Sequence, residues 1–318
     1  MLARITNGIL KVAALAADRP LPAPTDDERR LIEVLRDDLR ALPVMPVAGV
    51  PDSEANWNRN LNELRDLVLN DDPRNFLRWP MVQRAMFVTY PPYVVNEFAY
   101  LRAQPDWASR WRDAIRESPV GHPLRLGFYP ASSGNLTHHA YHLARFESLS
   151  GQRVEDLDVV FEFGGGYGGM ARLVHNLGFR GRYVTFDLPH FSALQRFFLA
   201  RLGIPLRKAG EFADGLSGVA CVSDLDALRA VLASVRSDAR SLFLATWSIS
   251  ETPEHIRASV LPLVSHFSHF CVAYQHRFEE VDNVAYFKRW RETVGDVAWR
   301  DERIPHLPHD SYLVGRRR

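Results

Sequence analysis

One segment near the middle of the chain restricts the fold more than any other. Residues 159–173 read VVFEFGGGYGGMARL: a short apolar run, a glycine-rich turn and the start of an amphipathic stretch. β-Branched and aromatic residues in a short run favour a strand, and glycine adopts the backbone angles that a tight strand-to-helix turn requires. Glycine also lets a ligand approach the backbone, because no Cβ is in the way. The segment therefore predicts a strand, a turn and a helix of the kind that binds nucleotide-like cofactors in α/β proteins.

The sequence after residue 157 alternates between two patterns. Short apolar runs are separated by amphipathic, helix-like stretches, which predicts βαβ crossovers and a buried parallel sheet. A Pro- and His-rich link joins the last two runs, so these can pair antiparallel. The seven expected strands are 159–163, 183–186, 219–222, 242–246, 270–274, 297–300 and 311–315. The sequence thus predicts an α/β fold with five parallel strands and an antiparallel C-terminal hairpin.

The first 125 residues have helical periodicity interrupted by Pro-rich joints. Leu31, Leu35 and Leu39 fall on one face of a helix that Thr25 or Asp26 could cap. We find no comparably clear strand before about residue 125. The chain is therefore expected to consist of a helical N-terminal region, 1–125, for acceptor binding or dimerisation, and a cofactor-binding domain, 126–318.

Two acidic residues help to distinguish between cofactors. The glycines satisfy both the dinucleotide pattern GxGxxG and the methyltransferase pattern acidic-x-GxGxG, in which Glu162 is the acidic residue. A carboxylate there can bind the ammonium of a methionine moiety, whereas a dinucleotide has no cation to balance it. Asp187 ends the second strand, where a carboxylate about 20 residues beyond the glycines can bind ribose hydroxyls. The pattern favours S-adenosylmethionine over NAD(P); the alternative is a glycine-rich turn with no ligand.

The cofactor is expected at the carboxyl ends of the strands, where open α/β sheets bind their ligands. The expected cofactor-binding residues are Glu162, Gly164, Gly165, Gly166, Gly168, Asp187, Leu188, Asn135, Ser223, Asp224, Thr246, Trp247 and Ser248.

Four further features are the segments FEFGGGYGGMARL, YVTFDLPHFSALQ, WSISETPEH and IPHLPHDSYLVG. These segments resemble the sugar O-methyltransferases of bacterial polysaccharide loci, and the resemblance covers about residues 125–318. It implies a Rossmann-like, seven-stranded class I methyltransferase that transfers a methyl group to a sugar hydroxyl, for example in a mannoside precursor of a polysaccharide. The fourth strand lacks the Asn/Asp-Pro-Pro-Tyr ending of amine methyltransferases, which fits an oxygen acceptor. The alternatives are another small-molecule alcohol or phenol as acceptor, or a non-catalytic subunit that retains the fold.

A protonated hydroxyl is a poor nucleophile, so a general base would help the transfer. Glu251 follows the fourth strand and His276 follows the fifth, which makes them the first candidates. Glu251 could instead cap the helix that begins near Pro253. His139 is a third candidate, on a lid over the site. A bound Mg²⁺ could also acidify the hydroxyl, although the sequence identifies no ligands for it.

Two other polar and aromatic clusters have structural alternatives. His138 and His142 have the i, i+4 spacing of helical metal ligands, but the zincin pattern needs Glu where His139 stands, so a packed pair is favoured. The aromatic residues around Pro91 and Pro92 are interpreted as core, with an acceptor groove as the alternative.

Composition limits the partners. Lys and Arg number 39 against 38 Asp and Glu, which gives a formal net charge of +1 and argues against a nucleic-acid partner. No apolar run approaches the roughly 18 residues of a membrane span, and residues 1–17 are interpreted as a short amphipathic helix rather than a signal peptide. The two cysteines, Cys221 and Cys271, argue for a reducing compartment. We therefore expect a soluble, cytoplasmic enzyme with a small-molecule or oligosaccharide acceptor. The sequence is also compatible with a homodimer.

Overall fold

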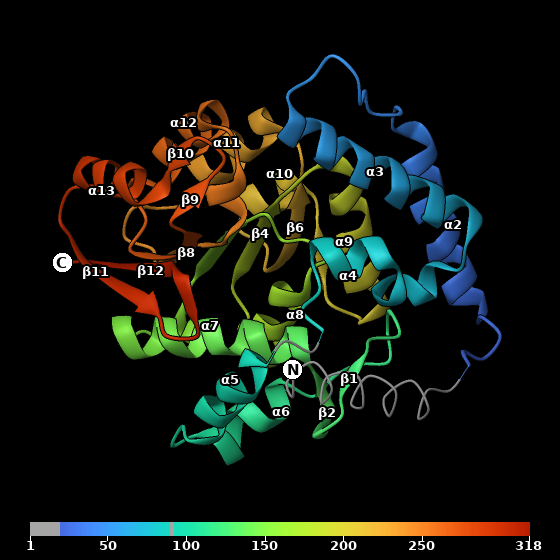
Figure 1. Cartoon of the computed structure of the whole chain (residues 1–318), viewed down its shortest axis with the longest axis horizontal. Helices are drawn as coiled ribbons and strands as arrows, with labels where there is room; N and C mark the ends of the chain where they lie inside the picture. The colour runs from blue at the N-terminus through green and yellow to red at the C-terminus, as the bar shows by residue number, and fades with distance from the viewer. Residues whose placement is uncertain (1–19, 90–91) are drawn as a thin grey trace. The chain divides into compact units, whose positions relative to one another are not determined.

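A computed structural model of the chain describes residues 20–89 and 92–318 (Figure 1). These residues form two compact units. The first unit comprises the described residues up to 141 together with 166–176 and 189–204. The second comprises residues 142–165, 177–188 and 205–318. The helix expected at residues 1–17 lies outside the described ranges.

The second unit is built on an eight-stranded sheet, in the order β11-β12-β8-β7-β3-β4-β6-β5. The strands from β8 to β5 run parallel, and β12 pairs antiparallel with both β8 and β11. Their bounds are β3 Val159–Phe163, β4 Arg182–Phe186, β5 Leu206–Arg207, β6 Gly218–Val222, β7 Ser241–Thr246, β8 His269–Gln275, β11 Val297–Ile304 and β12 Leu307–Arg317. This confirms the predicted Rossmann-like sheet of five parallel strands and an antiparallel hairpin. The two-residue β5 adds an edge strand that was not predicted.

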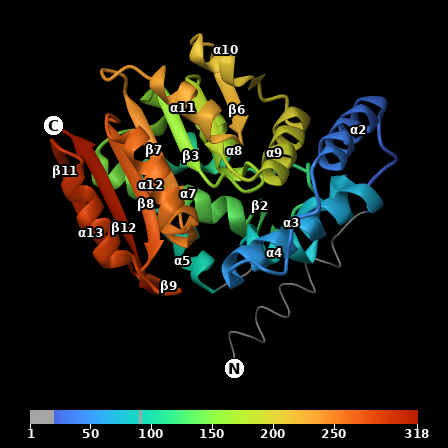
Figure 2. The same ribbon diagram turned by 90° about the horizontal axis from the view of Figure 1, so that it is seen from above.

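Alternation along β3 divides its side chains between the two faces of the sheet. Val159, Phe161 and Phe163 enter the hydrophobic core. Glu162 therefore lies on the opposite face. On the core side, the aromatic ring of Phe287 on α13 (Asn283–Thr293) packs against that of Tyr274 on β8, with ring centroids 4.8 Å apart. Figure 2 shows helix α13 beside this end of the sheet. The other elements of this unit are η3 Val154–Asp156, α10 Ala209–Ala213, α11 Leu225–Ala233, η4 Ser248–Glu251, α12 Glu254–Val260, η5 Leu261–Val264, β9 Arg277–Phe278, β10 Val281–Asp282 and α13 Asn283–Thr293.

The first unit is mainly helical, as predicted for the N-terminal region. It also contains α8 and α9, the helices that follow β3 and β4 in the chain. Helix α7, Gly134–Ser150, has residues in both units. The elements of the first unit are α2 Asp26–Ala41, α3 Asp52–Asn70, η1 Pro73–Arg78, α4 Pro80–Ala85, α5 Tyr93–Arg102, the π-helix η2 Trp107–Trp111, α6 Arg112–Ala114, β1 Arg125–Leu126, β2 Tyr129–Ser133, α8 Gly169–Asn176 and α9 Pro189–Arg201.

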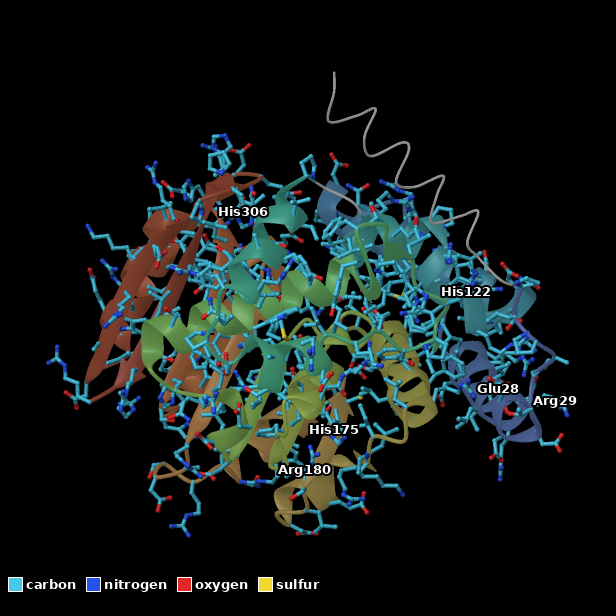
Figure 3. All side chains as sticks on the ribbon, turned by 90° about the horizontal axis from the view of Figure 1, so that it is seen from below. Glu28, Arg29, His122, His175, Arg180 and His306 are labelled. Carbon is cyan, nitrogen blue, oxygen red and sulfur yellow. The ribbon has the colours of Figure 1, made fainter. Side chains whose placement is uncertain are left out.

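Helix α2 begins where the sequence predicts. Thr25 Oγ1 accepts a hydrogen bond from Glu28 N at 3.2 Å, and the Glu28 carboxylate accepts one from Thr25 N at 2.8 Å, which completes a capping box. Glu28 and Arg29 lie side by side in sequence at the start of this helix (Figure 3). Glu28 also pairs with Arg201 of α9, and Asp38 pairs with Arg196 of α9 at 2.8 Å. Helix α2 is thus fixed to α9.

None of the helices in the described part of the chain is long and apolar enough to cross a membrane.

Candidate active site

The turn after β3 has an unusual backbone. Gly164, Gly166 and Gly168 have φ angles of +75°, +55° and +95°. L-residues rarely adopt such angles, whereas glycine does so without strain. The three glycines of the acidic-x-GxGxG pattern are therefore the positions at which this turn requires glycine.

The absence of a side chain has different consequences at Gly164 and Gly166. A Cβ at Gly164 would lie 2.3 Å from Ser248 Cβ, so Ser248 already fills that space. The Ser248 hydroxyl donates a hydrogen bond to Phe163 O at the end of β3. A Cβ at Gly166 would lie 3.4 Å from Met86 Cβ, which is an ordinary contact. The expectation that glycine leaves room for a ligand therefore fits Gly166 but not Gly164, where glycine serves packing.

Glu162 is buried on β3, with 4% of its surface exposed. Tyr183 on β4 donates a hydrogen bond from its hydroxyl to Glu162 Oε2 at 2.8 Å. Burial raises the pKa of Glu162 to about 8; the Tyr183 hydrogen bond opposes this rise and the Asp187 charge adds to it. The carboxyl group is therefore mostly protonated at neutral pH unless a cation binds beside it.

Asp187 lies directly after β4, where its backbone N–H donates to Val222 O at 3.1 Å. Its Oδ1 accepts a hydrogen bond from Leu188 N at 2.8 Å, and the Leu188 side chain is 39% exposed. Because β3 and β4 are neighbouring parallel strands, Glu162 and Asp187 both lie near the same end of the sheet.

Other expected cofactor residues already have partners within the chain. Asn135 accepts a hydrogen bond from Val88 N at 3.0 Å and donates one to the Tyr167 hydroxyl at 2.9 Å. Asp224, after β6, caps α11 by accepting from Ala227 N at 2.8 Å. A cofactor contact by either side chain would have to share or replace these bonds. Ser223, next to Asp224, is exposed.

The turn after β7 begins with a strained residue. Thr246 ends β7, and Trp247 has φ +62° and ψ −36°, which is rare for a bulky side chain. Its indole Nε1–H donates to Asp310 Oδ1 at 2.7 Å. Its carbonyl oxygen accepts from Ser250 N at 2.8 Å and from Glu251 N at 3.1 Å. This geometry turns the chain directly into η4, which ends at Glu251.

Glu251 is half-buried, and Gln275 Nε2 lies 3.4 Å from its Oε1. Burial raises the pKa of the Glu251 carboxyl; the Gln275 hydrogen bond opposes the rise and the Asp310 charge adds to it. Pro253 is the N-cap residue of α12, with no side-chain cap bond. Glu251 therefore does not have the helix-capping role that was its structural alternative.

His276 and Glu251 belong to one hydrogen-bond network. His276 Nε2 lies 2.9 Å from Ser311 Oγ, and its carbonyl oxygen accepts from Asn283 N at 3.0 Å. The buried side chain of Asn283 donates to Gln275 O at 2.9 Å and to Ser250 O at 3.2 Å. One asparagine thus joins the end of β8, which carries His276, to the turn that carries Glu251.

His139, the third candidate base, lies on α7 in the first unit. Burial and the neighbouring His138 lower its pKa to about 3, so the imidazole is neutral and only weakly basic. A Cβ at Gly169 would lie 3.1 Å from His139 Cε1, which places this ring against the start of α8.

His138 and His142 each have a separate partner. His138 Nδ1 lies 2.8 Å from Glu97 Oε1, and His142 Nδ1 forms a hydrogen bond with the Tyr312 hydroxyl. These contacts agree with the packed interpretation of the pair. Across residues 20–89 and 92–318, we find no group of three or more His, Cys, Asp or Glu side chains arranged to hold a metal ion.

The aromatic residues around Pro92 are mostly interior; Tyr90 and Pro91 lie outside the described ranges. Phe87 and Phe98 are buried, and the Phe98 ring centroid lies 4.6 Å from that of Tyr129. Their packing accords with the core interpretation and leaves the groove untested.

Sequence reasoning missed four residues of the site: Tyr183, Arg257, Asn283 and Asp310. Arg257 did carry a signal, because it shares the helical spacing of Val260, Leu261 and Val264, which are all buried. A charged residue on an apolar stripe is unusual and indicates a specific set of partners. The contacts of Asn283 and Asp310 join segments distant in the sequence and leave no local pattern.

No protein-family model matches the chain, and no curated protein matches it in sequence. Several solved methyltransferase structures are similar to it. A precorrin-6y methyltransferase of Geobacter metallireducens is 14% identical over 56% of this chain and 86% of its own, with a TM-score of 0.37. An SAH-bound methyltransferase of Podospora anserina is 10% identical over 74% of this chain and 92% of its own, with a TM-score of 0.37. A 23S rRNA methyltransferase is 17% identical over 55% of this chain and 67% of its own, with a TM-score of 0.35. At these values the similarities carry no information about substrate or residue roles.

Proposed function

We propose that the protein is an S-adenosylmethionine-dependent O-methyltransferase that acts on a sugar hydroxyl of a mono- or oligosaccharide. The proposal rests on the residues that follow the carboxyl ends of β3 and β4. Three alternate glycines with positive φ follow Glu162, and Asp187 lies directly after the neighbouring parallel strand, β4. This arrangement suits a cofactor that has both a ribose and a cationic amino-acid end.

Different residues would bind different parts of the cofactor. The Asp187 carboxylate would accept hydrogen bonds from the ribose hydroxyls, and Glu162 would lose its proton to pair with the ammonium group. Gly166 would let the methionine portion approach the turn, since no side chain of its own stands there. The cofactor supplies a methyl group that is already activated on a sulfonium, so the protein mainly has to align the acceptor.

Glu251 or His276 would act as the general base that removes the proton from the acceptor hydroxyl. Both belong to the network at the carboxyl ends of β7 and β8. The raised pKa of Glu251 brings this carboxylate closer to the basicity that proton removal near neutral pH favours. A sugar as acceptor is supported by the resemblance of the segments around β3, β4, β7 and β12 to sugar O-methyltransferases.

Calorimetry tests cofactor binding first. The protein should bind S-adenosylhomocysteine and not NAD⁺. Asp187→Ala should weaken S-adenosylhomocysteine binding by about 1.5–3 kcal/mol, the scale of a lost charge-assisted hydrogen bond. Asp226→Ala, on the exposed side of α11, is a matched control that should bind normally.

Methyl transfer is then followed by mass spectrometry with a panel of mono- and oligosaccharides and, in parallel, alcohols and phenols. A methylated saccharide is the expected product. Transfer to phenols alone would replace the sugar by another hydroxyl acceptor, and cofactor binding without any transfer would favour a non-catalytic subunit.

A further inference from the structure

Arg257 on α12 is fully buried and binds three different acceptors. Its Nε donates to Thr252 O at 2.6 Å, its Nη2 to Ser250 O at 2.7 Å and its Nη1 to Asn283 Oδ1 at 2.6 Å. All three acceptors are neutral, and Arg257 forms no ion pair with any residue that the structure describes. Its guanidinium carbon lies 4.8 Å from the centre of the Tyr286 ring, a cation–π contact that offsets part of the cost of burial.

A buried guanidinium without a direct ion pair is costly for folding. Burial lowers the pKa of Arg257, and the nearby Tyr286 and the Glu254 charge oppose this only in part. An apolar side chain would be less costly at this position, because Val260 at the end of α12 and Val264 at the end of η5, which follow Arg257 at helical spacing, both lie in the core. An apolar residue, however, could not bind backbone carbonyls. The two carbonyls that Arg257 binds belong to Ser250 and Thr252, the residues on either side of Glu251.

The turn that Arg257 binds is itself strained. Trp247, at its start, has a φ of +62°. A non-glycine residue keeps such an angle only where surrounding contacts over-determine the backbone. Asn283 adds to these contacts, because it accepts from Arg257 and donates to both Ser250 O and Gln275 O.

We propose that Arg257 is a positioning residue which, together with Asn283, fixes the turn after β7 and so holds the Glu251 carboxyl group at the end of the sheet. The role of Glu251 as a base rests on the proposed function, whereas the positioning does not. Arginine suits this task better than lysine, since its planar fork binds three acceptors at separate points and an ammonium group is a single point.

Carbon-13 NMR titration of the glutamate carboxyl groups in the full chain tests the proposal without an acceptor. Glu251→Gln identifies the Glu251 signal. Arg257→Lys keeps the charge but cannot span all three acceptors, so the turn should loosen and water should reach Glu251. Its titration midpoint should then fall toward the ordinary glutamate value of about 4.3. The other groups that face Glu251, the Gln275 amide and the Asp310 carboxylate, are the same in both proteins.

Arg229→Lys on α11 is the matched control, because Arg229 is exposed and pairs only locally with Asp226. It should leave the midpoint unchanged. An unchanged midpoint in folded Arg257→Lys protein would overturn the proposal. If that variant does not fold, Asn283→Ala carries the same expectation and the same contrary result.

Methyl transfer provides a second readout that separates the two proposals. In a wild-type protein that methylates a saccharide, Arg257→Lys should lower kcat at least about tenfold, leave the KM for S-adenosylmethionine unchanged and move the acid limb of the kcat profile to lower pH. If wild-type protein methylates nothing, the proposed function fails while the NMR midpoint still decides the positioning.

Discussion

At the scale of single residues, the buried Glu162 links the stability of the fold to pH. Its folded-state pKa of about 8 lies far above the unfolded value of about 4.3. Between these two values the unfolded chain releases the proton and the folded chain retains it. The free energy of unfolding therefore falls as pH rises through this window and levels off above about 8.

Glu162→Gln should remove this pH dependence. The amide cannot ionise, so the difference in Tm between pH 5 and pH 8 should be smaller than in the wild-type protein. At pH 8 the substitution should avoid a loss in the free energy of unfolding that is on the order of a few kcal/mol. Thermal unfolding followed by circular dichroism at both pH values measures it. Equal pH slopes in the two proteins would mean that Glu162 is ionised in the folded state.

The three candidate bases can be ranked by single-turnover methyl transfer. Glu251→Gln or His276→Asn should reduce the rate by about 10²–10⁴-fold while cofactor affinity stays nearly constant. We expect His139→Asn to have the smallest effect, since a histidine with a pKa of about 3 is a weak base. EDTA should not change the rate unless a bound Mg²⁺ acidifies the hydroxyl. If all three variants keep near wild-type rates and EDTA has no effect, none of these residues is the base and the catalytic centre lies elsewhere.

At the scale of elements, the turn between β3 and α8 separates two uses of glycine. Gly164→Ala forces positive φ on alanine and also brings its Cβ against Ser248, whereas Gly166→Ala introduces only the backbone cost of about 1–2 kcal/mol. In urea unfolding, Gly164→Ala should lower the free energy of unfolding by about 1–3 kcal/mol more than Gly166→Ala does.

A double mutant isolates the steric part of that loss. Combining Gly164→Ala with Ser248→Gly removes the clash, so the two substitutions should be less than additive. Gly166→Ala combined with Ser248→Gly is the matched control and should be close to additive. Strict additivity in both pairs would show that Ser248 does not limit the space at Gly164.

The central parallel strands were predictable from sequence because apolar residues, many of them β-branched or aromatic, predominate in them, although β3 also contains Glu162. Residues 159–163 were predicted with the bounds that β3 has, and the predicted runs of β4, β6, β7 and β8 agree with these strands within one residue at either end. Edge pairing was harder to predict. Strand β11 continues past residue 300 to Ile304 through Asp301 and Glu302, which pair with β12 although their side chains are charged. The apolar signal therefore ended before the backbone pairing did.

The candidate site was predictable where its residues are adjacent in sequence. The glycine turn, Glu162 and Asp187 follow from local spacing. The partners of the β7 turn do not, since Arg257 depends on Asn283 and Trp247 depends on Asp310, each far along the chain. The positive φ of Trp247 also had no local signal, because tryptophan has no preference for that region of backbone angles.

At the scale of the whole molecule, the first compact unit combines segments that the sequence assigned to two regions. Helix α9 packs with the N-terminal helices: the ring centroids of Trp57 on α3 and Phe191 lie 6.1 Å apart, and those of Phe76 on η1 and Phe198 lie 5.7 Å apart. The boundary near residue 125 remains a prediction about domains. Within this unit, both aromatic contacts and ion pairs join residues before position 125 to residues after it.

A fragment of residues 126–318 should therefore fold poorly. Removing the first 125 residues takes Trp57 and Phe76 away from α9 and exposes the rings that they cover, each aromatic loss costing about 3–5 kcal/mol. Size-exclusion chromatography and binding of a hydrophobic dye should reveal aggregated or loosely packed fragment beside a compact full chain. A fragment with a cooperative thermal transition and no dye binding would show that residues 126–318 form an independent domain.

The packing of α9 against α2 and α3 has a consequence for synthesis on the ribosome. The N-terminal helices emerge first, but their partner helix ends at Arg201, well over a hundred residues after α3. At about 5–20 residues per second, roughly 7 to 26 seconds pass before that surface is available. During this time the apolar faces of α2 and α3 have no native partner on α9. A nascent chain of this protein should thus bind holding chaperones early and be released once the α9 segment has left the exit tunnel.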